Sequence, residues 1–337
     1  MNNTGASLIS RICLLSLLLF GLLVGVGILG IARGSSGWEI GAICKSLIRM
    51  DTADPVLTTI IWRIRLPRVL LAALVGASLS AGGLVFQALL RNPLAEPYIL
   101  GISGGAAVGA IIGILLGLSP FPGVSIAAFI GSGACLLLIL FMATGRTILK
   151  NESLLLSGVM INAFCSAIIM FLIAITQDAR IHNIMFWLMG DLSMVGLKQV
   201  AILAALVIPC FIVVFRYANI LNLILLGREM AQTMGVNIRV AGAVLLVVTS
   251  FMVSATVSQC GLLGFVGLVV PHFFRRLIGA DHRLLVPACL LGGGAYMVLC
   301  DMLARTLPAH GEMPVGVITA ILGAPLFIYL LKRPDKK

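Results

Sequence analysis

The fold is decided by the uncharged stretch from Pro97 to Gly145, which reads PYILGISGGAAVGAIIGILLGLSPFPGVSIAAFIGSGACLLLILFMATG. A membrane-spanning helix needs roughly 20 predominantly apolar residues, so this stretch is long enough for two. Its one cluster of turn-forming residues is Ser119–Gly123 (SPFPG), where the chain can reverse direction. The stretch therefore predicts two tightly connected membrane spans.

The composition of the whole chain agrees with a membrane protein. Of the 337 residues, 60% are hydrophobic and only 10% are charged, and the mean hydropathy is +1.15. The formal net charge is +11, but the basic residues lie in short gaps between apolar runs, where they set orientation and do not imply nucleic acid. The eight cysteines stand singly with no C-x-x-C pair, which argues against a disulfide framework or a zinc site.

The apolar runs predict an all-α polytopic protein, a single transmembrane domain over residues 1–337 with both ends on one side of the membrane. The first run is too long for the core of a signal peptide and is interpreted as a retained anchor. The uncharged region 240–274 is too long for one helix and short for two, so the part after Gly261, which contains Pro271, should be a short or broken span bordering a cavity. The predicted spans are 12–32, 66–90, 98–118, 124–145, 153–177, 199–215, 240–260, 262–274, 284–303 and 314–331.

The distribution of Lys and Arg predicts the orientation. With the N-terminus inside, the inner segments hold 14 of these residues and the outer segments nine, which favours an N-in, C-in topology. Arg63, Arg65 and Arg68 oppose the bias because they cluster at the outer start of the second span, in WRIRLPR. Two explanations stay open from the residues alone: docking of an acidic extracytoplasmic partner, or contact with lipid phosphates.

Glycines recur every four residues in the third span, so they share one helix face. Such a ridge lets a neighbouring helix approach closely, and we favour helix packing over the alternative of pore lining. The residues concerned are Gly101, Gly105, Gly109, Gly113 and Gly117.

Motifs for chemistry within the chain are missing. No lysine follows a glycine, so a phosphate-binding G-K-[ST] loop is impossible, and neither H-E-x-x-H nor G-x-S-x-G occurs. A proton-coupled transporter should carry acids at mid-membrane depth, but the acids at issue are all expected near span ends. We therefore expect no catalytic residue and no metal site, and an energy source outside this chain. The acids are Glu96, Glu152, Asp178, Asp281 and Asp301.

A polar island interrupts the apolar pattern at residues 226–240 (LGREMAQTMGVNIRV). Its Met and Ala residues favour helix and Gly235 then turns the chain, so we expect a short helix, a glycine and a second amphipathic piece. The topology places the island in the cytoplasm, as a surface that another protein could grip. The alternative is a solvated loop between two spans.

Four phrases carry a family resemblance. They are IRLPRVLLAALVGASLSAGG (64–83), RNPLAEPYILGISGG (91–105), GLLGFVGLVVPHFFRRLIGADH (261–282) and PVGVITAILGAPLFIYLL (314–331). Together with GREMAQTMGV (227–236) they resemble the FecCD permeases, the membrane subunits of ATP-binding-cassette (ABC) importers for siderophores, haem and cobalamin. The resemblance extends from about Trp62 to Leu331.

The resemblance implies a ten-helix permease of the type II ABC importer fold in a prokaryotic plasma (inner) membrane. Such a permease pairs with a second copy of itself, binds two cytoplasmic ATPase subunits that hold ATP and Mg, and receives cargo from an extracytoplasmic binding protein. It has no cofactor of its own and is not an enzyme. The implied cargo is a large metal chelate, a ferric siderophore, haem or cobalamin, which slides between apolar walls of the fifth and tenth spans. A self-contained secondary transporter and a membrane scaffold or receptor are the alternatives.

The resemblance also implies roles for single residues. The importer coupling pattern E-A-A-x-x-x-G falls on Glu229, Ala231 and Gly235, preceded by Arg228, with Met230 in place of the middle alanine. The docking arginines of the R-L-P-R and D-x-x-A-R phrases are Arg65, Arg68 and Arg305. The cytoplasmic gate falls on Asn92, Leu94, Lys150 and Asn151, and Lys150 is bulkier than the small polar residue expected there.

Overall fold

The computed structural model describes residues 3–34, 37–38, 55–98, 100–143, 151–176, 178–193, 195–308 and 311–332. This part of the chain is a bundle of helices with one two-residue strand pair, Arg33–Gly34 (β1) with Gly37–Trp38 (β2). Among the described residues, seven helices are long and apolar enough to cross a membrane, and α5 (Ile102–Leu115), α13 (Val266–Ile278) and α15 (Val315–Lys332) are shorter. The all-α, multi-span fold predicted from the sequence is confirmed.

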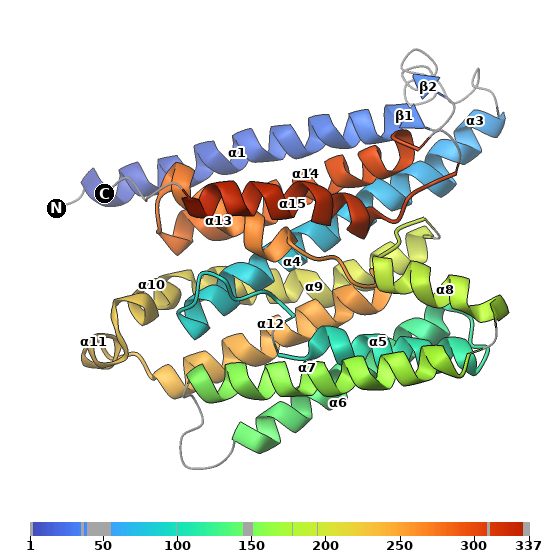
Figure 1. Cartoon of the computed structure of the whole chain (residues 1–337). Helices are drawn as coiled ribbons and strands as arrows, with labels where there is room; N and C mark the ends of the chain where they lie inside the picture. The colour runs from blue at the N-terminus through green and yellow to red at the C-terminus, as the bar shows by residue number, and fades with distance from the viewer. Residues whose placement is uncertain are drawn as a thin grey trace.

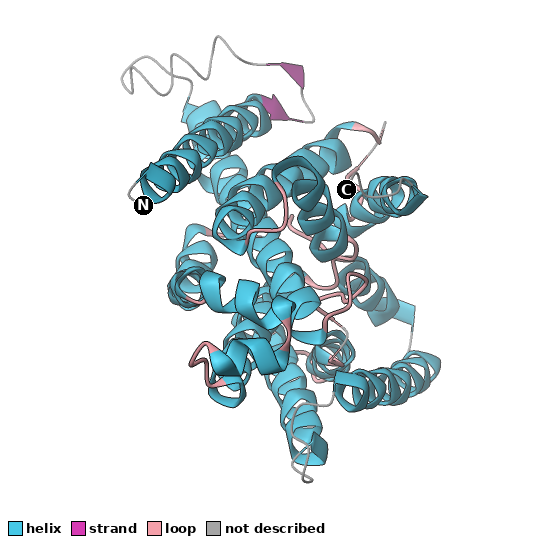
Figure 2. Cartoon of the chain, turned by 90° about the vertical axis from the view of Figure 1, so that its left-hand side faces the viewer, coloured by secondary structure: helices cyan, strands magenta, loops and turns pink. Residues whose placement is uncertain are grey.

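Each predicted span has its counterpart, and most ends agree within a few residues. The two chain ends and α11 (Arg228–Thr233) lie at one end of the bundle, and β1, β2 and α3 (Pro55–Ile60) lie at the other (Figure 1). Figure 2 looks onto the end that carries the termini and shows most of the helices end-on. The counterparts, in order, are α1 (Asn3–Ala32), α4 (Leu66–Leu90), α5 (Ile102–Leu115), α6 (Ser125–Ala143), α7 (Asn151–Ala174), α9 (Leu197–Arg216), α12 (Ile238–Cys260), α13 (Val266–Ile278), α14 (His282–Thr306) and α15 (Val315–Lys332).

The sequence did not predict five smaller helical pieces. Two precede α4 without interruption, α3 (Pro55–Ile60) and the π-helical turn η2 (Ile61–Arg65), and the turn η3 (Pro120–Val124) leads into α6. The other two are α8 (Asp178–Met189), after the fifth span, and α10 (Ala218–Leu226), before the polar island. The island itself contains one short helix, α11 (Arg228–Thr233).

Helix α4 is the centre of one half of the bundle, because α9, α12, α13 and α14 all pack against it. Close approach requires glycine at two points of contact. A Cβ atom added at Gly83 would lie 1.9 Å from the carbonyl oxygen of Gly267 in α13, and one added at Gly76 would lie 2.1 Å from that of Gly293 in α14. Backbone therefore contacts backbone in the interior, as is common where lipid supplies no hydrophobic drive for association.

Two breaks in the helices meet inside the bundle. The chain leaves helix after Leu90 and resumes it at Ile102, and it leaves α12 after Cys260 and resumes it in α13. The hydroxyl group of Tyr98 donates to the carbonyl oxygen of Leu263 at 3.0 Å and accepts from the amide of Leu263 at 3.0 Å. These bonds satisfy backbone groups that a continuous helix would have paired, so the predicted starts at residues 98 and 262 were too early.

Candidate coupling, gate and docking sites

The polar island forms a short helix, α11, between two glycine turns, at the end of the bundle that carries the termini. Gly227 and Gly235 bracket α11 with φ of 130° and 82°, conformations that residues with a Cβ atom rarely adopt. Ala231 is buried, and the amide of Val236 donates back to its carbonyl oxygen at 3.0 Å. Glu229 is exposed. The geometry presents polar side chains and the apolar side chains of Met230 and Met234 to solvent.

The second amphipathic piece expected after Gly235 is part of a membrane span instead. The side chain of Asn237 accepts from the amide of Val240 at 3.2 Å and so caps the first turn of α12 directly. An N-cap of this kind satisfies amides that have no partner within the helix. The neighbour of α11 on the other side is α10, which the sequence interpretation missed because its residues are as apolar as those of a span.

Helix α10 is tied to the rest of the bundle by hydrogen bonds. The side chain of Asn222 donates to Asp281 at 2.8 Å and accepts from the amide of His282 at 2.8 Å, at the start of α14. Arg91 at the end of α4 donates to the carbonyl oxygen of Ile224 at 2.6 Å. Helix α10 thus connects α11 with two core helices.

Asp281 keeps its charge at neutral pH. Its carboxylate accepts from Nη2 of Arg283 at 2.6 Å, and this hydrogen bond, with that from Asn222, lowers the pKa of Asp281 to about 2. The acceptor for Asn222 therefore stays ionised over the physiological range.

The residues of the expected cytoplasmic gate lie partly outside the described chain. Arg91 ends α4 in the left-handed conformation, with φ of 50°. The Asn92 side chain then accepts from the amide of Leu94 at 2.9 Å, and the Leu94 side chain is 50% exposed. Lys150 lies outside the described residues, and of Asn151 the structure describes only its place at the start of α7.

The three expected docking arginines are buried. The exposed fractions of Arg65, Arg68 and Arg305 are 6%, 4% and 5%. Arg65 donates to the carbonyl oxygen of Ile31 at 2.9 Å, and Arg305 donates to that of Gly30 at 3.1 Å, so both hold the end of α1.

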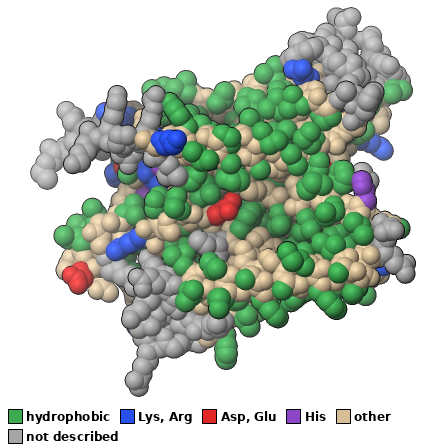
Figure 3. All heavy atoms as spheres, viewed as in Figure 1, with side chains coloured by type: hydrophobic (Ala, Val, Ile, Leu, Met, Phe, Trp, Pro, Cys, Tyr) green, Lys and Arg blue, Asp and Glu red, His purple; other side chains and the backbone are tan. Residues whose placement is uncertain are grey.

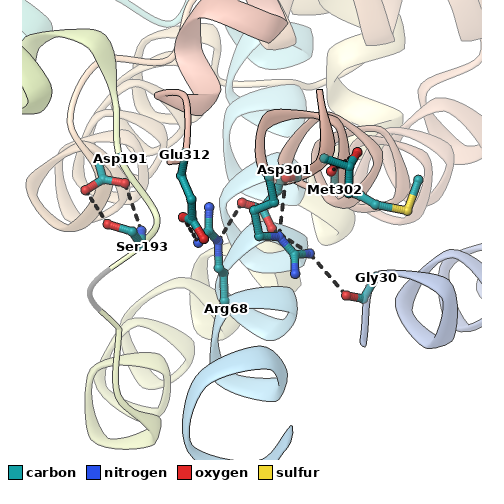
Figure 4. Close-up of polar contacts among 9 residues, drawn as sticks. Gly30, Arg68, Asp191, Ser193, Asp301, Met302 and Glu312 are labelled. Atoms are coloured by element: carbon teal, nitrogen blue, oxygen red, sulfur yellow. Dashed lines mark hydrogen bonds and ion pairs between the residues drawn. The ribbon is translucent and has the colours of Figure 1, made fainter. Parts of the chain in front are cut away.

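Arg68 and Arg305 also share one acid. Nε of Arg68 donates to Oδ1 of Asp301 at 2.8 Å, and Nη2 of Arg305 lies 3.1 Å from Oδ2 (Figure 4). Arg68 is bound in addition by Glu312, at 2.5 Å, and the side chain of Glu312 is 39% exposed. The sequence signal for this network is the D-x-x-A-R phrase, in which Asp301 and Arg305 are four residues apart. Arg68, the third residue of the network, is distant from them in the chain. Arg63 is the exposed arginine of the WRIRLPR segment.

Three of the five glycines in the ridge face α6. Cβ atoms added at Gly105 and Gly109 would lie 2.4 Å and 2.2 Å from backbone oxygens of α6, and one at Gly113 would lie 3.2 Å from Ala127. The other two lie outside the helix, Gly101 just before α5 and Gly117 just after it, with φ of 67° and 73°. This side of α5 therefore packs against a neighbouring helix.

A cavity of about 500 Å³ lies between the end of α5, helix α8, and the facing ends of α9 and α12. Three aromatic side chains contribute to its wall, those of Phe121, Phe186 and Trp187, and polar groups such as Gln199 and Gln259 face it. The sequence interpretation missed the cavity because it missed α8.

Comparison with known proteins agrees with the resemblance. The model of the FecCD transport family matches residues 22–333. The chain is 40% identical over 273 residues to the vitamin B12 import system permease protein BtuC of Salmonella arizonae, covering 81% of this chain and 83% of that protein. It is 43% identical over 280 residues to the hemin transport system permease protein HmuU of Yersinia pestis, with the same coverage, 81% and 83%.

Solved structures are also similar. One of an inward-facing metal-chelate type ABC transporter superposes with a TM-score of 0.83 at 30% identity, covering 93% of this chain and 98% of that one. PsaBC from Streptococcus pneumoniae shares the fold, with a TM-score of 0.60 at 18% identity over 88% of this chain and 96% of that one.

Proposed function

The chain belongs to the FecCD transport family, and we propose that it carries a ferric siderophore, haem or cobalamin from an extracytoplasmic binding protein into the cytoplasm. It is a multi-pass inner-membrane permease subunit of the ABC importers. The single observation that carries the proposal is the match over residues 22–333 together with relatives named for vitamin B12 and hemin import.

ATP hydrolysis is assigned to a separate partner. The chain has no G-K-[ST] loop to hold a nucleotide phosphate. We assign the contact with two ATPase subunits, which bind ATP and Mg, to α11 and the turn after it. Arg228 and Glu229 would make the contact, and buried Ala231 and left-handed Gly235 would hold the turn in shape. In support, α11 directly follows α10, and α10 is hydrogen-bonded to the end of α4 and the start of α14. A displacement of α11 by a partner would therefore be transmitted to these core helices.

The passage for cargo is assigned to the face that carries α7 and α15, where a second copy of the chain would complete it. Both helices expose large apolar side chains, among them Phe164 and Phe171 on α7 and Ile321 and Ile328 on α15. A protein surface this apolar is typical of contact with lipid or with another protein. Asn92, Leu94, Lys150 and Asn151 are assigned to the gate at the cytoplasmic end.

Docking of the binding protein is assigned to the opposite end of the bundle, around Arg65, Arg68 and Arg305. Burial supports an indirect role for these three, in which they hold α1, α4 and α14 together under the docking surface. Arg63 and Glu312 are the exposed charged side chains beside them and are assigned the direct contacts.

The test is reconstitution in proteoliposomes. The purified chain alone should hydrolyse no ATP, and the chain with its ATPase partner and a cargo-loaded binding protein should take up cargo only when ATP is present. Uptake driven by a proton or sodium gradient without the ATPase would establish a secondary transporter instead. Absorbance spectra of the binding protein's cargo would separate haem, cobalamin and ferric chelates.

A further inference from the structure

Glu96 lies where the two helix breaks meet, at the N-terminal end of the short span α13. Its Oε1 accepts from the backbone amide of Phe265 at 3.0 Å, and Phe265 is the N-cap residue of α13, with φ of 69°. Two residues further along, Tyr98 holds Leu263 of the same break. The carboxylate therefore faces the positive end of the α13 dipole, which stabilises a negative charge.

The length of α13 gives the depth of this carboxylate. The helix has 13 residues and ends with Arg275 and Arg276 in its last turn, on the side of the chain termini. At 1.5 Å per residue its first residue lies about 18 Å from its last along the helix axis. The hydrocarbon core of a membrane is about 30 Å thick, so with the last turn of α13 at one surface the carboxylate that bonds its N-cap residue lies within the core.

The neighbours of Glu96 belong to the face assigned to the passage. A Cβ atom added at Gly323 of α15 would lie 2.5 Å from Cβ of Phe265, so α15 packs directly on the break. The two breaks pass between α15 and α7 in Figure 1. Acidic atoms are visible near the middle of this largely apolar face in Figure 3.

A carboxylate at this depth is costly, and such residues face a protein interior or a water-filled pathway. The side chain of Glu96 is only partly buried. Because α15 packs on Phe265, whose amide donates to Glu96, the carboxylate lies beside α15.

We propose that Glu96 is a cargo-facing residue that sets the charge selectivity of the passage, favouring chelates with cationic or hydrogen-bond-donating groups and opposing anionic ones. The inference rests on the proposed function, because it needs a passage beside α7 and α15. The charge of a carboxylate in a low-dielectric wall acts over several ångströms with little screening. One carboxylate is therefore enough to affect which charged chelates pass.

A purely structural role would be to hold the break through the amide of Phe265. Two substitutions separate the roles. Glu96→Gln keeps a carbonyl oxygen for that amide and removes the charge, whereas Glu96→Leu removes both. A structural role predicts a change for Glu96→Leu alone, and a charge role predicts one for Glu96→Gln as well.

A cysteine at Gly264 can report the local potential without any transport assay. A Cβ atom added at Gly264 would have Glu96 Oε1 as its nearest neighbour, at 3.8 Å, with room for a thiol. Gly264→Cys would be introduced into a variant whose native cysteines are replaced by serine or alanine, in the complex with the ATPase partner. The rates of labelling by a cationic and by an anionic methanethiosulfonate would be measured with and without Glu96→Gln.

The expected result is faster labelling by the cationic reagent, with the ratio of the two rates falling about tenfold in the Glu96→Gln background. An unchanged ratio, or no labelling at all, would overturn the inference and leave the proposed function untouched. In uptake assays, Glu96→Gln should raise the uptake of an anionic chelate relative to a neutral one. If the unmodified complex shows no ATP-driven uptake, the proposed function fails, and the labelling ratio still reports on Glu96.

Discussion

Arg68 and Asp301 form a buried ion pair at 2.8 Å between α4 and α14, although they are 233 residues apart in the chain. Arg305 approaches the same carboxylate from the other side. Asp301 is thus shared by two guanidinium groups, and Glu312, which pairs with Arg68, supplies the second negative charge.

Asp301→Asn should be strongly destabilising, because it leaves two buried arginines without a full counter-charge. Breaking a buried pair of this kind costs roughly 3–5 kcal/mol. Arg283→Gln is the matched control, since it breaks the exposed pair with Asp281, for which about 1 kcal/mol or less is expected. Thermal unfolding in detergent measures both, and equal shifts in Tm would contradict the burial of the network.

Docking should depend on the exposed arginine of the same segment. Arg63→Glu should weaken binding of the binding protein by up to about 1 kcal/mol, more at low salt, without lowering Tm. Arg305→Glu should lower Tm, because it places a carboxylate beside buried Asp301. Binding and Tm are measured on the same samples. If Arg305→Glu keeps its Tm and loses binding, this arginine contacts the partner directly.

The glycine contacts of α6 give a test of packing within one helix. A Cβ atom at Gly131 would lie 2.2 Å from the carbonyl oxygen of Gly105, whereas one at Gly133 has no atom within 4 Å. Gly131→Ala should therefore destabilise the protein by about 1–3 kcal/mol. Gly133→Ala should be neutral or slightly stabilising, because alanine favours helix. Comparable Tm values for the two variants would argue against the contact between α5 and α6.

The sequence predicted the ten helical segments because long apolar runs are visible in its hydropathy pattern. The length of the uncharged region 240–274 also predicted the break after Gly261. The longer break between Leu90 and Ile102 could not be predicted, since it depends on bonds such as that between Tyr98 and Leu263, 165 residues apart. For the same reason it assigned Arg65, Arg68 and Arg305 to contact with a partner, whereas the structure buries all three. The cationic side chains suggested exposure, and the neutralising Asp301 is recognisable as their partner only in three dimensions.

Asn222 should matter for coupling through its bonds to Asp281 and His282. Asn222→Leu keeps the size of the side chain but leaves the backbone amide of His282 without its acceptor, which costs about 1–3 kcal/mol. We expect α10 to loosen from α14, so that ATP hydrolysis continues while cargo uptake per ATP falls. Thr306→Val is the control, because it removes a hydroxyl group that bonds only within its own helix, at 2.8 Å to Met302. A normal ratio of uptake to hydrolysis in Asn222→Leu would show that α10 does not transmit the motion.

Gly235→Val should impair coupling while leaving insertion in the membrane intact. Its φ of 82° is strained for any residue with a Cβ atom and most of all for a β-branched one, although no atom lies within 4 Å of the added position. The turn after α11 would therefore change course, and ATPase assembly should weaken or hydrolysis should become independent of loaded binding protein.

Two controls accompany Gly235→Val. Gly235→Asn should retain most activity, since asparagine tolerates the left-handed conformation. Gly279→Val imposes the same kind of strain, at φ of 90°, in another turn with open space. Uptake, stimulated ATPase activity and expression level are compared across the three. Loss of coupling only in Gly235→Val supports the assignment of α11 to the ATPase contact. Wild-type uptake and stimulation in this variant would show that the island is only a solvated connection between α10 and α12.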